Sequence, residues 1–365
     1  MTAEASAKEY NRIKVRLNIA DMVLSLIYIS VLAFSGLSSW LVEQVSLYST
    51  IPAVQFLLFV FAAGILFSVV SIPMDFYGGY IIEHRYNLSN QTFIKWLWDK
   101  MKGLLVGLAL GIPLLLAFYY FLQYTGENWW LYFSALIFAF SVLLARLAPV
   151  LLFPLFYRFT PLESEDIKKP LLDLLDRHNI EFKGIYSFDM SRETKKANAG
   201  FTGLGKTKRI VLSDTLVDNF TPREILVIFA HELGHYKKRH IAKNIIISGL
   251  VIFAMFYLCS QVYQLTITGM GFTSTADIAA IPVLFFYLTI FSLVLMPVTN
   301  AISRAFEREA DRFAIHVSGA KESFISSMER LADLNLADKS PHPFIEWFMY
   351  SHPSIQKRID LAKDL

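Results

Sequence analysis

His231 and His235 stand four residues apart in the chain, and Glu232 directly follows the first of them. Residues at positions i and i+4 of a helix lie on one face, one turn apart. Both imidazoles could therefore bind a single Zn²⁺ ion, and Glu232 could act on a water molecule held by the metal. The spacing predicts a hydrolytic zinc site that still needs a third protein ligand, because catalytic zinc normally has three.

A carboxylate is the better candidate for the third zinc ligand. His240 directly follows three basic residues, and we interpret it as a solvated surface residue. Glu307 and Asp311 share one face of a helical pattern that follows the last apolar segment. Glu307 could complete a set of two histidines and one glutamate, and Asp311 could accept a hydrogen bond from a ligating imidazole. The spacing alone leaves open an ordinary charged helix face, with Arg304 and Arg308 paired to acids.

The beginning of the metal-motif helix is well marked. Thr221 is a candidate N-cap, Pro222 takes the first helical position and Glu224 can complete a capping box. Upstream, residues 164–178 have a helical pattern and residues 184–188 resemble a strand.

A hairpin is predicted between that strand and the metal helix. Residues 197–202 and 208–213 can pair around a turn at 203–206. A small sheet therefore precedes the metal helix.

Composition indicates a membrane protein. The 365 residues are 55% hydrophobic with a mean hydropathy of +0.44, against about 45–50% apolar residues in soluble domains. A net charge of +3, without basic stretches interleaved with aromatics, argues against a nucleic-acid partner. Cys259 is the only cysteine, which excludes an intrachain disulfide and a cysteine-based zinc site. The first apolar run is too long for a cleavable signal, and no clean cleavage site follows it.

Six apolar segments are each near the length needed to cross a bilayer. They cover residues 17–41, 52–74, 104–122, 130–157, 243–264 and 279–299. The connections at 42–51, 123–129 and 265–278 contain no Lys or Arg, whereas the opposite side is rich in both. The positive-inside rule therefore predicts that both termini and the metal site are cytoplasmic.

We thus expect a mainly α fold, a multi-pass transmembrane bundle joined to a metalloprotease domain with a small β-sheet. Residues 1–157 would hold spans 1–4, with a cytoplasmic loop at 75–102. Residues 158–242 would form a cytoplasmic protease segment with the sheet and the metal helix, and residues 243–299 would hold spans 5 and 6. Residues 300–365 would form a cytoplasmic protease segment with the third ligand.

Some residues in the apolar segments allow two readings. The four-residue spacing of Gly103, Gly107 and Gly111 would permit close helix packing, although glycine is common in such helices. Arg146 could face a wet interior or extend to the interface. Three tryptophans fit an aromatic belt on the far side of the bilayer, namely Trp40, Trp129 and Trp130.

Six dispersed motifs resemble, in order, the CAAX prenyl protease 1 family of membrane zinc metalloproteases, which is related to the HtpX protease. They are IEHRYNLSNQT at 82–92, PLFYRFTPL at 154–162, NAGFTG at 198–203, AHELGHYK with HIAKNIIIS at 230–248, SRAFEREAD at 303–311 and YSHP at 350–353. The resemblance covers nearly the whole chain from about residue 50.

The resemblance implies a gluzincin-like domain that binds one Zn²⁺ per chain through His231, His235 and Glu307. Glu232 would be the general base and then the acid that protonates the leaving amine. His352 matches the family's histidine near the oxyanion.

The resemblance also implies how substrate binds. Asn198, Ala199 and Gly200 match the edge strand that pairs with extended substrate in the family, a mode that tolerates varied side chains. From the residues alone, Asn198 would be an ordinary turn residue and His352 a residue at a helix start.

In the family, the spanning helices enclose a water-filled chamber, and peptide entering from the side is cut inside. Eukaryotic members of the family have seven spans, whereas we count six here. We therefore expect the missing span to be the first, which leaves the completeness of the chamber wall open. Short loops and the absence of a C-terminal retention signal favour a bacterial inner-membrane protein over one of the endoplasmic reticulum or nuclear envelope.

Substrates would be peptides or proteins, either prenylated Cys-aliphatic-aliphatic-x tails or damaged and mis-inserted membrane proteins. The residues do not separate these substrates and specify no oligomeric state.

Two other classes remain as alternatives. A non-catalytic scaffold or transporter with a structural zinc would not need Glu232. A site-two type protease would place its motif within a span, but here Lys237, Lys238 and Arg239 follow the motif at once.

Overall fold

Six long helices dominate the computed structural model, which describes residues 3–180, 182, 184–202 and 209–365. Within these residues six helices are long and apolar enough to cross a membrane. They are α1 (Ala3–Phe34), α3 (Pro52–Phe76), α5 (Phe93–Tyr124), α6 (Trp129–Leu151), α10 (His240–Gly269) and α11 (Ile281–Ser318). The prediction of a multi-pass, mainly helical fold is confirmed.

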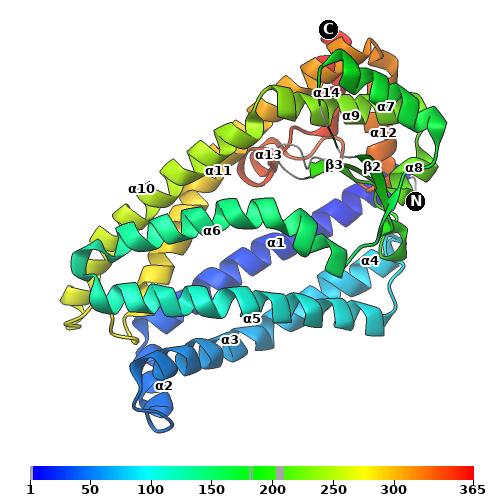
Figure 1. The fold of residues 1–365 in the computed structure, drawn as a ribbon. Coiled ribbons are helices and arrows are strands. Elements are labelled where there is room, and N and C mark those ends of the chain that lie inside the picture. The colour runs from blue at the N-terminus through cyan, green and yellow to red at the C-terminus, as the bar shows by residue number, and fades with distance from the viewer. Residues whose placement is uncertain (1–2, 181, 183, 203–208) are drawn as a thin grey trace.

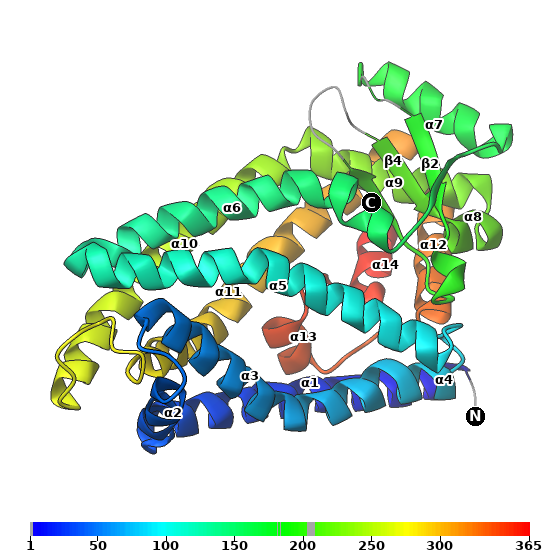
Figure 2. The same ribbon diagram turned by 60° about the horizontal axis from the view of Figure 1, so that its bottom comes forward.

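The long helices run between two unlike ends of the molecule (Figures 1 and 2). One end holds the short helix α2 (Leu37–Ser46), the 3₁₀ turn η2 (Gly126–Asn128) and the connection at 270–280. The other end holds the sheet and the shorter helices (Figure 1).

The predicted end of the first span is wrong. The first span was expected to continue to residue 41, but α1 ends at Phe34. Gly36 adopts a left-handed φ of 82°, which reorients the chain into α2. The four-residue spacing of Gly103, Gly107 and Gly111 does not mediate close packing among the described residues, because a Cβ added at any of them would meet no neighbouring atom within 4 Å. Arg146 is exposed on α6.

Trp129 does not belong to an interfacial belt. It is only 1% exposed and lies against Phe118 and Phe256, with ring centroids 5.9 Å and 6.4 Å away. Phe56 is also fully buried there and stacks on Tyr119 at 4.6 Å. An aromatic core therefore joins α3, α5, α6 and α10 near one end of the bundle.

A four-stranded sheet has the order β1-β2-β4-β3. Its strands are β1 (Phe159–Pro161), β2 (Gly184–Phe188), β3 (Ala199–Thr202) and β4 (Arg209–Ser213). β2 and β4 are parallel, while β1–β2 and β3–β4 are antiparallel. The predicted β3–β4 pairing is confirmed, its turn at 203–206 lies outside the described residues, and β1 was not predicted.

Shorter helices surround the sheet and the metal motif. They are the π-helical turn η1 (Tyr77–Ile81), α4 (Ile82–Arg85), η3 (Phe153–Leu155), α7 (Glu165–Arg177), η4 (Met190–Arg192), α8 (Asp214–Asn219), α9 (Pro222–Lys237), α12 (Lys321–Leu334), α13 (Pro343–Met349) and α14 (Ile355–Asp364). The second hydrophobic core fills the space between the sheet, α7, α9 and α12, and includes the buried side chains Leu171, Ile210, Leu212, Ile225 and Phe324.

The predicted start of α9 is confirmed. Thr221 accepts a hydrogen bond from the backbone of Glu224, and the Glu224 carboxylate accepts one from the backbone of Thr221, which makes a complete capping box. α9 packs mainly on α11, and α11 continues past residue 299 to Ser318. The last apolar segment and the Glu307 region therefore belong to one unbroken helix.

Candidate metal centre and substrate cleft

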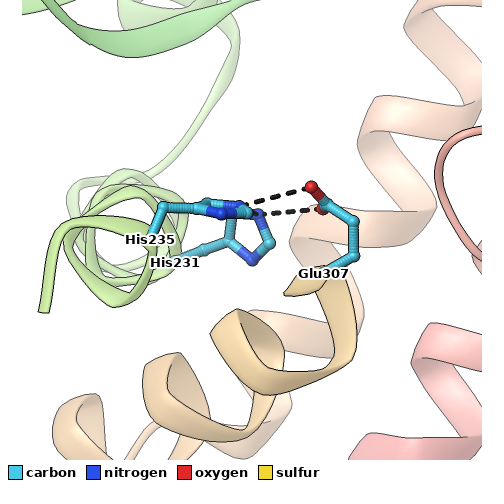
Figure 3. Close-up of side chains that lie close together, drawn as sticks. All are labelled: His231, His235 and Glu307. Carbon is cyan, nitrogen blue, oxygen red and sulfur yellow. Dashed lines mark hydrogen bonds and ion pairs between the residues drawn. The ribbon is translucent and has the colours of Figure 1, made fainter. Parts of the chain in front are cut away.

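Two helices bring the predicted ligands together. His231 and His235 project from one face of α9, and Glu307 projects toward them from α11 (Figure 3). The two Nε2 atoms are 3.1 Å apart. Glu307 Oε2 is 3.2 Å from His231 Nε2, and Glu307 Oε1 is 3.3 Å from His235 Nε2. Among the described residues, these three form the group suited to a metal ion.

The donor set fits zinc. Tetrahedral ligands at about 2.0–2.1 Å from Zn²⁺ stand about 3.3–3.4 Å from one another, close to the three separations observed. Glu307 is 6% exposed, and its Oε2 is buried without a hydrogen-bond partner. An unpaired buried carboxylate oxygen is costly, and a cation between the three side chains would satisfy it.

Asp311 and Arg358 support His231. Asp311 Oδ1 lies 2.8 Å from His231 Nδ1, and the Arg358 guanidinium holds both carboxylate oxygens of Asp311 at 2.9 Å and 2.6 Å. A metal at Nε2 requires the proton on Nδ1, where it can donate to Asp311. Burial lowers the pKa of His231, but the nearby carboxylates of Asp311 and Glu307 outweigh this and raise the pKa to about 9. The two carboxylates therefore favour a positive charge on this imidazole.

His240 supports His235, and our interpretation of it as a surface residue is wrong. His240 is 2% exposed, its Nδ1 lies 2.9 Å from His235 Nδ1, and its Nε2 lies 3.0 Å from Glu309 Oε2. Its ring stacks on Phe306 with centroids 4.4 Å apart. The chain turns back at Arg239, where φ is 55°, and this turn brings the first residue of α10 onto the metal motif.

A cleft of about 140 Å³ opens beside the metal ligands. Its lining includes Glu232, His352, Arg358, Asn198 and Ala199. Burial raises the pKa of Glu232, while His231 and His235 lower it. A raised pKa suits a carboxylate that accepts and returns a proton near neutral pH.

His352 lies at the mouth of this cleft. Its Nε2 is 3.4 Å from Glu307 Oε1, its Nδ1 is 2.9 Å from Ser351 Oγ, and its side chain is 61% exposed. A substrate carbonyl beside Glu307 could therefore be reached by the imidazole.

Asn198 leads into β3, which is the edge strand of the sheet on the side of the cleft. The two residues before Asn198 bind side chains from other elements. Lys196 Nζ lies 3.0 Å from Glu83 Oε2 on α4, and the backbone N–H of Ala197 donates to Asn335 Oδ1 at 3.1 Å. Glu83 also accepts from Tyr10 of α1 at 2.7 Å. The residues before the edge strand are thus tied to α1, to α4 and to the end of α12.

The structure brings together the residues that the sequence predicted for the site, namely the three ligands, Glu232, Asp311, His352 and Asn198. Sequence reasoning missed Arg358 and the role of His240. Arg358 lies 47 residues from Asp311, and no spacing signal connects them. For His240, a histidine five residues after His235 was a signal, which the adjacent basic residues obscured.

Family comparisons agree with this geometry. Residues 161–365 match the model of peptidase family M48, and residues 2–158 match the CAAX prenyl protease N-terminal model, described as five membrane helices. In the matched N-terminal region, the described residues contain four candidate spans, at 4–34, 52–85, 93–124 and 126–155.

Individual relatives match over nearly the whole chain. The Bacillus subtilis "Uncharacterized metalloprotease YhfN" is 31% identical, over 98% of this chain and 85% of its own length. The Saccharomyces cerevisiae "CAAX prenyl protease 1" is 30% identical, over 90% of this chain and 76% of its own. The crystal structure of Ste24p from S. mikatae superposes with a TM-score of 0.85 at 27% identity, covering 99% of this chain and 88% of that one.

The fold and the site define a multi-pass membrane metalloprotease. The chain belongs to peptidase family M48 and is a homologue of the CAAX prenyl proteases.

Proposed function

We propose that the protein is a zinc endopeptidase whose single Zn²⁺ is held by His231, His235 and Glu307. The observation that carries this proposal is the convergence of three donor atoms at tetrahedral separations, beside the Glu232 carboxylate in an open cleft. Asp311 would fix the tautomer of His231 through the hydrogen bond between them.

Glu232 would perform the proton transfers. When bound, zinc supplies Lewis-acid polarisation of the scissile carbonyl and of the attacking water. Glu232 takes a proton from that water as it attacks the carbonyl carbon, and then delivers the proton to the amine as the C–N bond breaks. His352, 3.4 Å from Glu307, is placed to donate to the carbonyl oxygen as negative charge develops on it.

The substrate would bind as an added strand. β3 presents a free edge among the described strands, and backbone pairing there would hold an extended peptide across the metal centre. Asn198, Ala199 and Gly200 would provide this edge.

Two substrate classes fit this mode of binding. Relatives named CAAX prenyl protease 1 support prenylated C-terminal tails. The similarity to a Bacillus subtilis metalloprotease supports a bacterial protein, and in a bacterial inner membrane the substrates would be damaged or mis-inserted membrane proteins. A prenylated and an unprenylated peptide of the same sequence distinguish the two classes.

The site would face the cytoplasm, together with both termini. This proposal rests on the connections at 42–51, 123–129 and 265–278, which lack Lys and Arg. In this arrangement residues 158–242 and 300–365 would form the catalytic part, and residues 1–157 and 243–299 the membrane part.

Cleavage of internally quenched peptides by purified protein tests the activity. We expect Glu232→Gln to retain zinc and to lose about 10²–10⁴-fold in kcat, because the base is removed while the ligands remain. Glu165→Gln, at a side chain that is 73% exposed on α7, is the matched control. If wild type and Glu232→Gln both bind zinc and neither cleaves any peptide, the alternative of a non-catalytic scaffold with a structural zinc would replace this proposal.

A further inference from the structure

A second cavity lies beside β3 and is separate from the metal cleft. Its volume is about 220 Å³. Aromatic and other apolar side chains dominate its wall, which consists of Phe153, Tyr157, Phe159, Phe188, Met190, Asn198, Ala199, Gly200 and Val211. The cavity and the metal cleft share Asn198 and Ala199, so both spaces border the same stretch of edge strand.

The pairing within the sheet places the two spaces on opposite faces. Gly200 is paired with Val211, and Ala199 with Leu212. Leu212 is buried in the core beneath α9, and Ala199 packs against that core. Side chains alternate between faces along a strand, so Gly200 and Val211 point away from α9. The cavity therefore lies on the face of the sheet opposite the metal helix.

An extended peptide paired with β3 would reach both spaces. Its successive side chains would alternate between the two faces of the enlarged sheet. A residue aligned with Ala199 would face the metal cleft, and its neighbours, aligned with Asn198 and Gly200, would face the cavity. The cavity thus meets substrate side chains directly next to a residue at the metal centre.

The size and chemistry of the cavity select what can enter it. An apolar cavity of about 150 Å³ is large enough to bind benzene, so 220 Å³ accommodates a leucine or phenylalanine side chain. None of the described residues that line the cavity carries a charge. A charged side chain would lose its hydration there without gaining a partner of opposite charge among the described residues, which is unfavourable.

We propose that this cavity is a specificity site that binds an uncharged, bulky apolar side chain of the substrate and rejects a charged one. The inference rests on the proposed peptidase function and adds a sequence preference to it. Gly200 borders open space, because a Cβ added there would meet no atom of the described residues within 4 Å. The missing side chain leaves room for the substrate.

Kinetics on quenched decapeptides test the inference, with one position at a time varied among Leu, Phe, Ala and Asp. We expect one position next to the cleavage site at which Leu and Phe exceed Asp at least tenfold in kcat/KM, with Ala between them. Gly200→Val would place two methyl groups in the cavity and reduce the ratio of Leu to Ala peptides to near one. Phe153→Ala, at a residue that is 44% exposed, would enlarge the cavity and raise the ratio of kcat/KM for Phe peptides to that for Leu peptides.

The control is Thr160→Val, because Thr160 is exposed on β1 at the other edge of the sheet. This variant should show the same ratios of kcat/KM between the peptides as the wild type. Equal cleavage of Leu and Asp peptides at every position would overturn the inference, as would unchanged ratios in both Gly200→Val and Phe153→Ala with zinc retained. A different result would contradict the proposed peptidase function: either the wild type cleaves no peptide, or Glu232→Gln cleaves as well as wild type.

Discussion

Gly234 of α9 lies directly against Ala310 of α11. A Cβ added at Gly234 would stand 3.1 Å from the Cα and 3.2 Å from the carbonyl oxygen of Ala310. Ala310 is fully buried, so its backbone has little room to move. The close approach of the two helices sets the separation between the histidines of α9 and Glu307 of α11. The glycine of the metal motif therefore has a geometric role in assembling the site.

We expect Gly234→Ala to weaken both the fold and metal binding. Overpacking costs about 1–3 kcal/mol, whereas the better helix propensity of alanine returns about 1 kcal/mol. The remaining strain would push α9 away from α11 and separate Glu307 from the histidines. Zinc affinity should fall severalfold, as measured by competition with a chromogenic chelator in detergent.

Gly249→Ala is the matched control. A Cβ there would stand 3.1 Å from the ring of Phe138, which is as close, but on the membrane part of α10. It should lower the unfolding temperature without changing zinc affinity. Equal zinc affinities in wild type and Gly234→Ala would show that the contact does not set the ligand geometry.

Glu224 should make the stability of the catalytic part dependent on pH. Glu224 is 3% exposed, and its carboxylate accepts hydrogen bonds from the backbone of Thr221 at 2.8 Å and from Ser326 Oγ at 2.8 Å. Burial alone raises the pKa of Glu224, but these bonds and Arg330 outweigh it and hold the pKa below the ordinary value of 4.5. A lowered folded-state pKa stabilises the protein above pH 4.5, and this contribution is lost as the pH falls through the folded-state value.

Glu224→Gln should remove this dependence. Thermal unfolding from pH 7 to pH 3 would show a steeper fall in wild type below pH 4.5 than in Glu224→Gln, because the amide does not titrate. The exposed residue Glu165 supplies the control, since Glu165→Gln should follow the wild-type curve. A Glu224→Gln curve parallel to wild type over the whole range would contradict the prediction.

Local patterns in the sequence predicted most of the elements of the fold. Apolar runs of span length, the Thr221 capping box and the strand-like run at 184–188 all depend on neighbouring residues, and each of these elements forms, although the first span ends earlier than predicted. The spacing of Glu307 and Asp311 likewise indicated one helical face, and the structure places both beside the histidines.

What the sequence could not show depends on contacts between distant segments. Trp129 is buried because α5 and α10 pack around it, and its position at the end of a span gives no sign of this. Arg358 reaches Asp311 only through the docking of α14 on α11. His240 lies in a basic stretch of the sequence, yet the left-handed turn at Arg239 folds it into the site.

That turn makes His240 a positioning residue for His235. A metal at His235 Nε2 requires the proton on Nδ1, which can then donate to His240 Nδ1 at 2.9 Å. The proton of His240 is in turn on Nε2, where it donates to Glu309 Oε2 at 3.0 Å. Groups that orient a ligating imidazole in this way are typically worth about 10–100-fold in metal affinity.

Two substitutions separate the hydrogen bond from the packing. His240→Asn keeps an acceptor near the position of Nδ1, whereas His240→Leu fills the space against Phe306 without an acceptor. We expect zinc affinity to fall about 10–100-fold in His240→Leu and to remain closer to wild type in His240→Asn, measured by chelator competition independently of activity. A purely structural role would reverse this order, because leucine replaces the buried ring better than asparagine does. Equal zinc affinities in His240→Leu and wild type would show that Glu309 and His240 do not act on the metal ligand.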